Sequence, residues 1–149
     1  MEDEKFRLIE LAMQGFNCSQ ILALMVLEAQ DRQNPELVRA MSGLLFGLGC
    51  GRLCGVLTGG CCVLGMYAGK DSSEQNADAR LPTMLSSFVE WFECEYTPQY
   101  GGINCADILQ DDARNKMTRC SLVVAESLEK LKEILAENDY DFSQQPQPM

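Results

Sequence analysis

The chain has 149 residues, eight cysteines and no histidine, and its formal net charge is −10. This length suits one domain with its own hydrophobic core. Without histidine there can be no Ser-His-Asp triad, no Cys-His pair, and no histidine ligand for zinc or haem. The acidic balance disfavours nucleic acid and anionic membranes as partners. Any bound metal must therefore be held by thiolates, carboxylates or backbone groups, and no haem is expected.

Apolar residues recur at three- and four-residue spacing along most of the chain, which is the pattern of amphipathic helices. The predicted helices cover residues 3–14, 18–30, 35–46, 54–68, 79–96, a short segment from 105, and 115–137. We therefore predict an all-α fold, a single-domain helical bundle of about six to seven helices over residues 1–137. From residue 138 to 149 we predict a disordered tail.

Two of these helices carry more specific predictions. In the first helix, the spacing of Phe6, Ile9 and Met13 predicts that these three side chains face inward. In the helix from residue 79, Pro98 and the Gly101-Gly102 pair are predicted to end the helical pattern.

An eight-residue segment occurs twice, with a cysteine at the same place in each copy. Residues 15–22 are Gly-Phe-Asn-Cys-Ser-Gln-Ile-Leu, and residues 102–109 are Gly-Ile-Asn-Cys-Ala-Asp-Ile-Leu. In both copies asparagine can cap a helix, so Cys18 and Cys105 are predicted to be the first helical residues. The N–H groups of a first turn and the helix dipole favour a thiolate at such a position.

Residues 53–69 carry no charge, but the run is at the short limit for a membrane span and is rich in glycine. We therefore expect no membrane insertion. Glycines recur at every fourth position from residue 43 to 59, and on a helix they would form a ridge beside which a backbone or a cofactor could lie. Gly55 and Gly59 are accordingly candidates for cofactor binding, with tight helix packing as the alternative. Residues 47–54 are predicted to form a glycine-rich turn.

The segment Cys-Gly-Val-Leu-Thr-Gly at residues 54–59 is similar to the C-G-A-x-x-G motif of the redox-active family named C-GCAxxG-C-C after its cysteine pattern. Residue-by-residue matching places the four characteristic cysteines of that family at Cys18, Cys54, Cys105 and Cys120. The resemblance covers roughly residues 6–135, with one departure at Val56, where the family has alanine. It implies cysteine-based redox activity and does not define the reaction.

The four cysteines have different predicted surroundings. Cys54 follows the glycine-rich turn and Arg52, which makes it the candidate attacking thiol of a metal-free mechanism, with Cys18 or Cys105 as the resolving thiol. Cys120 lies within the last helix, where nearby basic side chains favour a thiolate. The other four cysteines, at positions 50, 61, 62 and 94, form neither a C-x-x-C motif nor a zinc-ribbon spacing.

Three functions follow from these features. The first is an electron-transfer protein in which Cys18, Cys54, Cys105 and Cys120 bind an iron–sulfur cluster or, less favoured, another metal such as zinc. The second is a metal-free thiol–disulfide oxidoreductase, and the third is a non-catalytic helical interaction module. Both redox functions require the four cysteines to lie around one pocket. Sulfurs scattered well beyond about 7 Å would contradict both.

The sequence says less about the location, the partners and the assembly of the protein. The first residues lack the basic and apolar regions of a secretory signal, so a cytoplasmic location is expected, where thiols are kept reduced. The expected partner is a redox protein that the sequence does not identify, and a homodimer is left open as an assembly.

Overall fold

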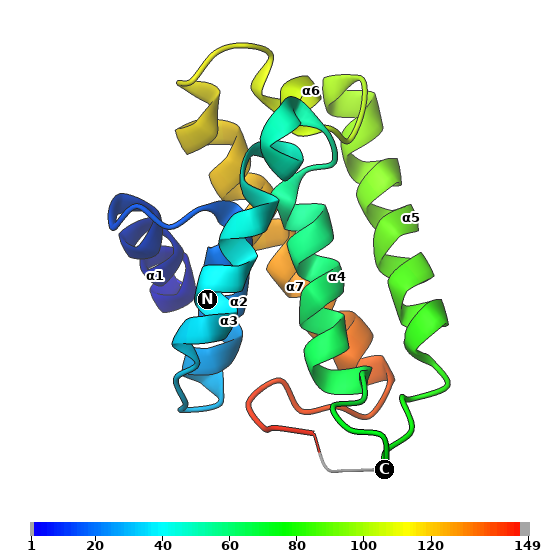
Figure 1. Cartoon of the computed structure of the whole chain (residues 1–149). Coiled ribbons are helices and arrows are strands. Elements are labelled where there is room, and N and C mark those ends of the chain that lie inside the picture. The colour runs from blue at the N-terminus through cyan, green and yellow to red at the C-terminus, as the bar shows by residue number, and fades with distance from the viewer. Residues whose placement is uncertain (1, 147–149) are drawn as a thin grey trace.

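The computed structural model describes residues 2–146. Within that range the chain forms seven α-helices and no β-strand, which confirms the all-α prediction. The helices are α1 (Glu2–Met13), α2 (Cys18–Ala29), α3 (Pro35–Met41), α4 (Gly55–Ala68), α5 (Leu81–Tyr100), α6 (Cys105–Leu109) and α7 (Ser121–Glu137). Figure 1 shows α4 in the middle of the bundle, where it contacts α2, α5 and α7.

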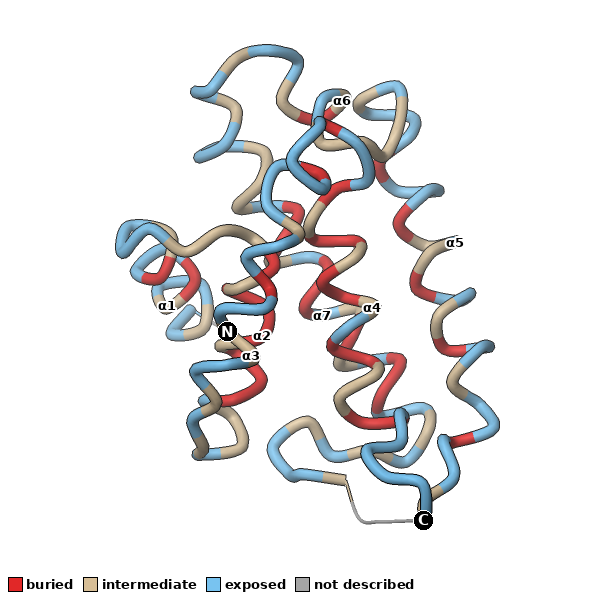
Figure 2. Tube along the Cα trace, viewed as in Figure 1, coloured by how far each residue is buried: buried red, intermediate tan, exposed pale blue. Residues whose placement is uncertain are grey.

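The hydrophobic core surrounds α4. Val56, Val63 and Leu64 of this helix are fully buried, and the rings of Phe88 and Phe92 pack against it from α5. The buried segments in Figure 2 follow α2, α4 and α7 through the centre of the molecule. In the part of the chain that the structure describes, no helix combines the length and the apolar composition needed to cross a bilayer.

The orientation of α1 differs from the prediction. Phe6, Ile9 and Met13 are 67%, 44% and 77% exposed, whereas Leu8 and Leu11 are buried. Two ion pairs fix this rotation of the helix. On one side Arg7 Nε lies 2.8 Å from Oε1 of Glu28 in α2, and on the other Glu4 pairs with Lys132 of α7. The apolar residues of α1 therefore allow either of two faces to point inward. Only the observed face lets Arg7 and Glu4 form their ion pairs with the neighbouring helices.

The end of α5 also differs from the prediction, because the helix continues through Pro98 to Tyr100. Pro98 lies in the last turn and is exposed, so water can satisfy the carbonyl group that its missing N–H leaves unpaired. Gly101 ends the helix in a left-handed conformation with φ 83°, and its N–H donates to the carbonyl oxygen of Thr97. The glycine was therefore predicted correctly as the terminator and the proline was not.

The glycine-rich segment before α4 is a turn, as predicted, so its glycines do not form one helical ridge. Gly47, Gly49 and Gly51 have positive φ, as do the non-glycine residues Phe46 and Leu48. At Gly47 an added Cβ would stand 2.2 Å from the carbonyl oxygen of Arg52. The chain consequently folds back on itself here and delivers residue 54 to the start of α4.

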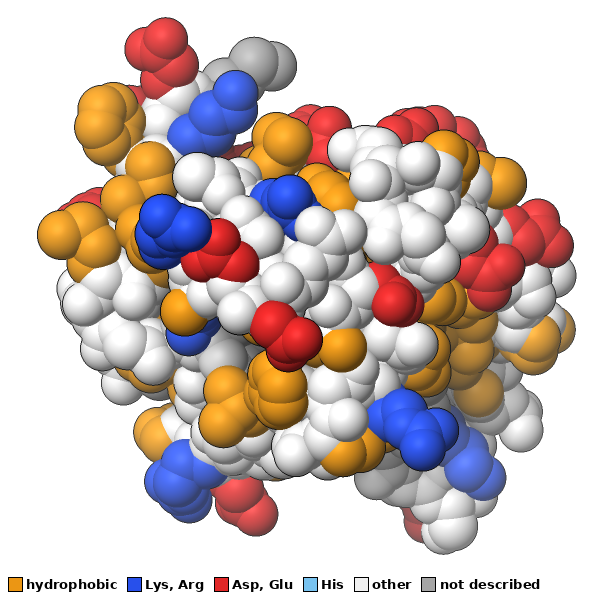
Figure 3. All heavy atoms as spheres, turned by 90° about the horizontal axis from the view of Figure 1, so that it is seen from above, with side chains coloured by type: hydrophobic (Ala, Val, Ile, Leu, Met, Phe, Trp, Pro, Cys, Tyr) orange, Lys and Arg blue, Asp and Glu red, His pale blue; other side chains and the backbone are white. Residues whose placement is uncertain are grey.

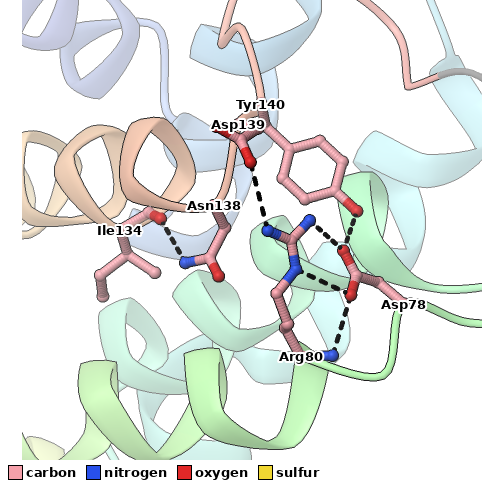
Figure 4. A network of polar contacts seen from close by, with 6 residues as sticks. All are labelled: Asp78, Arg80, Ile134, Asn138, Asp139 and Tyr140. Atoms are coloured by element: carbon pink, nitrogen blue, oxygen red, sulfur yellow. Dashed lines mark hydrogen bonds and ion pairs between the residues drawn. The ribbon is translucent and has the colours of Figure 1, made fainter.

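The C-terminal segment packs against the bundle over residues 138–146, whereas the sequence predicts disorder from residue 138. The hydroxyl of Tyr140 donates to Oδ2 of Asp78 at 2.6 Å, and Arg80 holds the same carboxylate at 2.9 Å (Figure 4). The hydroxyl of Tyr67 donates to the carbonyl oxygen of Phe142. These contacts order the segment because a buried carboxylate needs partners. Residues 147–149 of the predicted tail lie outside the described range.

Candidate functional site

The first copy of the repeat begins α2 with a reciprocal cap. The backbone N–H of Gln20 donates to Oδ1 of Asn17 at 3.0 Å, and the N–H of Asn17 donates to Oε1 of Gln20 at 3.2 Å. Cys18 is the first helical residue, as predicted. Two orphan donors of the helix start are thereby satisfied, which holds Cys18 in a defined position.

The second copy of the repeat begins α6 in a similar way. Cys105 is the first residue of this short helix, and the N–H of Asn104 donates to Oδ2 of Asp107 at 3.0 Å. The repeat therefore encodes a local capping motif. In each copy an asparagine precedes the cysteine, and the side chain two residues after the cysteine accepts a hydrogen bond from the asparagine N–H. Because the motif spans only a few neighbouring residues, the sequence predicted both helix starts.

A two-residue antiparallel contact joins α6 to the start of α4. The N–H of Cys54 donates to the carbonyl oxygen of Ile103 at 3.0 Å, and the N–H of Cys105 donates to the carbonyl oxygen of Arg52 at 2.7 Å. These bonds place the backbones of two cysteines from distant parts of the chain side by side. The sequence carries no signal for this contact.

The fourth cysteine of the motif ends a wide turn, Lys116–Cys120, that leads into α7. This turn is attached to α6 by two side chains. Arg119 donates to the carbonyl oxygen of Ile108 at 3.0 Å, and Asn115 donates to that of Leu109 at 2.8 Å. Cys120 is thereby brought to the same end of the molecule as Cys105 and Cys54.

The four cysteines of the predicted motif line one cavity of about 110 Å³. The other lining residues are Asn17, Ser19, Leu44, Leu45, Phe46, Gly55, Ile108, Leu109 and Lys116. Cys50, Cys61, Cys62 and Cys94 do not line this cavity. The sequence thus predicted which cysteines line one cavity. It missed the apolar side chains that enclose them, because these come from two separate segments, residues 44–46 and 108–109, with no common pattern. Figure 3 looks onto this end of the molecule, where apolar side chains and charges of both signs are interspersed.

Ser19 is a positioning residue that the sequence analysis missed. It is 1% exposed, and its hydroxyl lies 2.8 Å from the carbonyl oxygen of Met41 and 2.6 Å from Oδ1 of Asn17. These contacts join the start of α2 to the end of α3. In the sequence, only the position of Ser19 directly after Cys18 could have indicated this role.

Cys54 does not have the low pKa expected of an exposed attacking thiol. The residue is 6% exposed, and burial raises the pKa of its thiol to about 12. The backbone N–H groups of Val56 and Leu57 lower this pKa, as expected at a helix start, but the effect of burial is larger. Burial also raises the pKa of Cys105. Position at a helix start therefore does not make these two residues thiolates in the metal-free protein.

The pKa of Cys120 depends on a neighbouring cysteine. The Cys18 side chain, followed by burial, raises the pKa of the Cys120 thiol. Lys116 and Arg119 act in the opposite direction, as the sequence predicted, but they do not prevail. Negative charge on Cys120 would also raise the pKa of Cys54 and Cys105, so the fourth cysteine interacts with the other three.

The two glycines proposed for cofactor binding lie in different surroundings. Gly55 lines the cavity, and an added Cβ would stand 3.2 Å from the carbonyl oxygen of Leu44. Gly59 does not line it, and an added Cβ would stand 2.9 Å from Cβ of Ser19. Tight packing against α2 accounts for Gly59, whereas a cofactor contact at Gly55 stays a prediction.

Residues 16–134 match the model of the family described as "Putative redox-active protein (C_GCAxxG_C_C)". The chain belongs to this family. No curated protein and no solved structure matches the chain. The match confirms the resemblance found in the sequence and covers all four cysteines of the cavity. Membership of this family identifies the chain as a redox-active cysteine protein without specifying its reaction.

Val56, which stands where the family motif has alanine, is fully buried in the core. It does not line the cysteine cavity, so the larger side chain leaves the cavity unchanged.

The four cysteines have the ligand type of some metal sites, but not the placement that a single metal ion needs. Four thiols and no imidazole are the ligands of iron–sulfur clusters and of some zinc sites. Within residues 2–146, however, no group of three or more cysteine or carboxylate side chains is placed to hold a metal ion. The arrangement therefore does not match a closed four-coordinate zinc site. The four cysteines do match an iron–sulfur cluster in the type and number of ligands, because such a cluster is bound by thiolates at several iron atoms.

Proposed function

We propose that this protein is an electron carrier whose four cysteines, Cys18, Cys54, Cys105 and Cys120, bind an iron–sulfur cluster. The observation that carries the proposal is their convergence: four of eight cysteines, from four separate segments, line one cavity, and these are the four of the family motif. A dithiol exchange site would need two of them. The number and the shared cavity favour a ligand set.

Apolar side chains in the cavity walls support this function. Leu44, Phe46, Ile108 and Leu109 surround the thiols with apolar surface. In the metal-free protein burial and neighbouring cysteines raise the pKa of the Cys54, Cys105 and Cys120 thiols, so binding of a cationic group would release their protons and relieve the cost of burying charge. When bound, a thiolate-ligated iron–sulfur cluster supplies one-electron transfer.

Two groups of the chain would adjust the charge of the occupied site. The backbone N–H groups of Val56 and Leu57 lower the pKa of Cys54 and so favour its thiolate, and groups that favour negative charge on a ligand sulfur also stabilise the reduced, more negative state of a site. Lys116 lines the cavity and adds a positive charge near the same sulfurs. We also propose that the electrons pass to and from a partner redox protein.

The test is iron binding by the full chain expressed with iron and purified without oxygen. We expect iron and sulfide in the protein and visible absorption bands that bleach on reduction. Cys54→Ser and Cys120→Ser should lose most of the iron, while Cys94→Ser, a matched control outside the cavity, should keep it. An iron-free, colourless protein after anaerobic reconstitution would refute the proposal, and so would equal iron loss in the Cys94→Ser control.

A further inference from the structure

A groove separate from the cysteine cavity lies along the second half of α2, a helix that contacts both α1 and α3. Figure 1 shows these three helices together on one side of the bundle. The groove has a volume of about 560 Å³, within the range of about 300–1,000 Å³ that is typical of sites for small organic ligands. It shares no lining residue with the cysteine cavity, so a ligand can bind here without touching the four cysteines.

The groove carries an excess of positive charge in an acidic protein. Three of the seven arginines of the chain line it, Arg7, Arg32 and Arg39, whereas none of the five lysines does. Over the described part of the chain, Glu28 is the one carboxylate among the lining residues. Three positive charges against one negative give the lining a formal charge of +2, while the whole chain carries −10. The groove therefore attracts anions that the rest of the surface repels.

The guanidinium groups keep N–H donors for a ligand. Arg7 Nε donates to Oε1 of Glu28 at 2.8 Å, and Arg32 Nε donates to Oε1 of Gln30 at 2.7 Å. A guanidinium has five N–H donors, so these bonds use only part of each group. Arg39 is exposed and takes part in none of the ion pairs found within the described residues. Paired N–H groups of arginine match the oxygens of a carboxylate or a phosphate.

Apolar side chains lie beside these arginines. Leu27 is 2% exposed, and Leu24, Pro35 and Val38 line the groove with it. An inorganic ion would leave this apolar surface in contact with water, whereas an organic body attached to the anionic group would cover it. The lining therefore suits a molecule that combines one anionic group with an apolar body.

We propose that this groove binds a small, water-soluble organic anion. Arg32 and Arg39 bind its carboxylate or phosphate group, and its apolar body packs against Leu24, Leu27 and Val38. Arg7 remains paired with Glu28 and adds positive charge at the wall formed by α1. This binding goes beyond the proposed electron transfer, because it uses none of the cysteines.

The test uses the full chain and the fluorescent probe 8-anilinonaphthalene-1-sulfonate, an anion with an aromatic body. We expect saturable binding with a rise in fluorescence. Arg32→Gln and Arg39→Gln should each weaken binding by about two- to fivefold, the effect of one ion pair at an exposed site. Arg114→Gln removes the same charge outside the groove and should bind the probe like the wild type. Equal affinities of these three variants for the probe would overturn the proposal.

A further variant should change the affinity in the opposite direction. Glu28→Gln removes the negative charge from the groove and releases Arg7, so it should tighten probe binding by about two- to fivefold. Glu133→Gln, which removes an exposed and paired carboxylate of α7, is the matched control and should leave the affinity unchanged. Unchanged or weaker binding by Glu28→Gln would refute the assignment of the arginines to the anionic group.

Competition for the probe defines the ligand class. Phenyl phosphate carries an anionic group and an apolar body, inorganic phosphate has only the anion, and benzyl alcohol has only the neutral body. We expect phenyl phosphate to displace the probe at a concentration about tenfold below that of the other two compounds. Equal displacement by inorganic phosphate would indicate a simple ion site, and equal displacement by benzyl alcohol a purely apolar one, and either result overturns the proposal. Iron content of the same variants reports on the proposed function alone, because none of the substituted residues lines the cysteine cavity.

Discussion

Gly59→Ala tests whether this glycine serves helix packing or leaves room for a cofactor. A Cβ at this position would stand 2.9 Å from Cβ of Ser19 and 3.0 Å from its Cα, which belongs to the backbone of α2. Ser19 is buried, and its hydroxyl is hydrogen-bonded to the carbonyl oxygen of Met41 at 2.8 Å. The neighbour is therefore held in place, and an added methyl group would force the two helices apart.

The magnitude follows from comparison with Gly65→Ala on the same helix. No heavy atom lies within 4 Å of an added Cβ at Gly65, so that variant serves as the control. Replacing a helical glycine by alanine gains about 1 kcal/mol in both cases. Overpacking costs about 1–3 kcal/mol and applies only to Gly59. The difference in the free energy of unfolding between the two variants isolates this overlap, with Gly59→Ala less stable by about 1–3 kcal/mol.

The assay is urea and thermal unfolding of the metal-free protein, followed by circular dichroism at 222 nm, a helix signal. At about 2–4 °C per kcal/mol for chains of this size, the two midpoints should differ by roughly 2–12 °C. Should Gly59→Ala prove as stable as Gly65→Ala, the packing argument is wrong. The glycine would then be free to lie beside a bound cofactor.

Three further outcomes can be measured. Burial raises the pKa of Cys54 to about 12, so iodoacetamide at pH 8 should modify exposed Cys94 and leave Cys54 intact in peptide mass spectra; equal modification contradicts this. The hydrogen bond from Arg80 lowers the pKa of Asp78, so the stability that this carboxylate adds is complete above its unfolded pKa of about 3.9 and is lost as the pH falls below it. In urea titrations, the gap between wild type and Asp78→Asn should therefore narrow below about pH 4, and a constant gap would refute the assignment. Gly60→Ala, with a Cβ 2.4 Å from Cε2 of buried Phe88, should be less stable than Gly65→Ala by about 3 kcal/mol, and equal unfolding midpoints would contradict this overlap.

The helix starts at the cysteines were predictable because their determinants are local. Asn17 and Asn104 each interact with a residue three positions ahead, so a short segment of sequence contains the whole device. The turn before α4 was predictable for the same reason, since closely spaced glycines allow the positive φ angles that it requires. The recurrence of the same eight-residue segment strengthened both predictions.

The inner face of α1 and the ionisation of Cys54 were not predictable from their own segments. The spacing of Phe6, Ile9 and Met13 is as helical as that of Leu8 and Leu11, and ion pairs to other helices select between the two faces. A helix start lowers the pKa of a cysteine whereas burial raises it, and at Cys54 burial has the larger effect. Whether water reaches Cys54 depends on side chains from other segments.

The sequence by itself determined the all-helical class and the helix starts at Cys18 and Cys105, and its resemblance to the family indicated the set of four cysteines. Capping and periodicity act over about four residues, and the cysteine motif is a property of the chain alone. The tertiary structure decided that the four cysteines line one largely apolar cavity and that Cys18 and Cys120 also line a second one. The cysteine cavity forms where the starts of α2 and α4 meet α6 and the turn before α7, and burial between distant segments depends on how helices pack rather than on any local pattern.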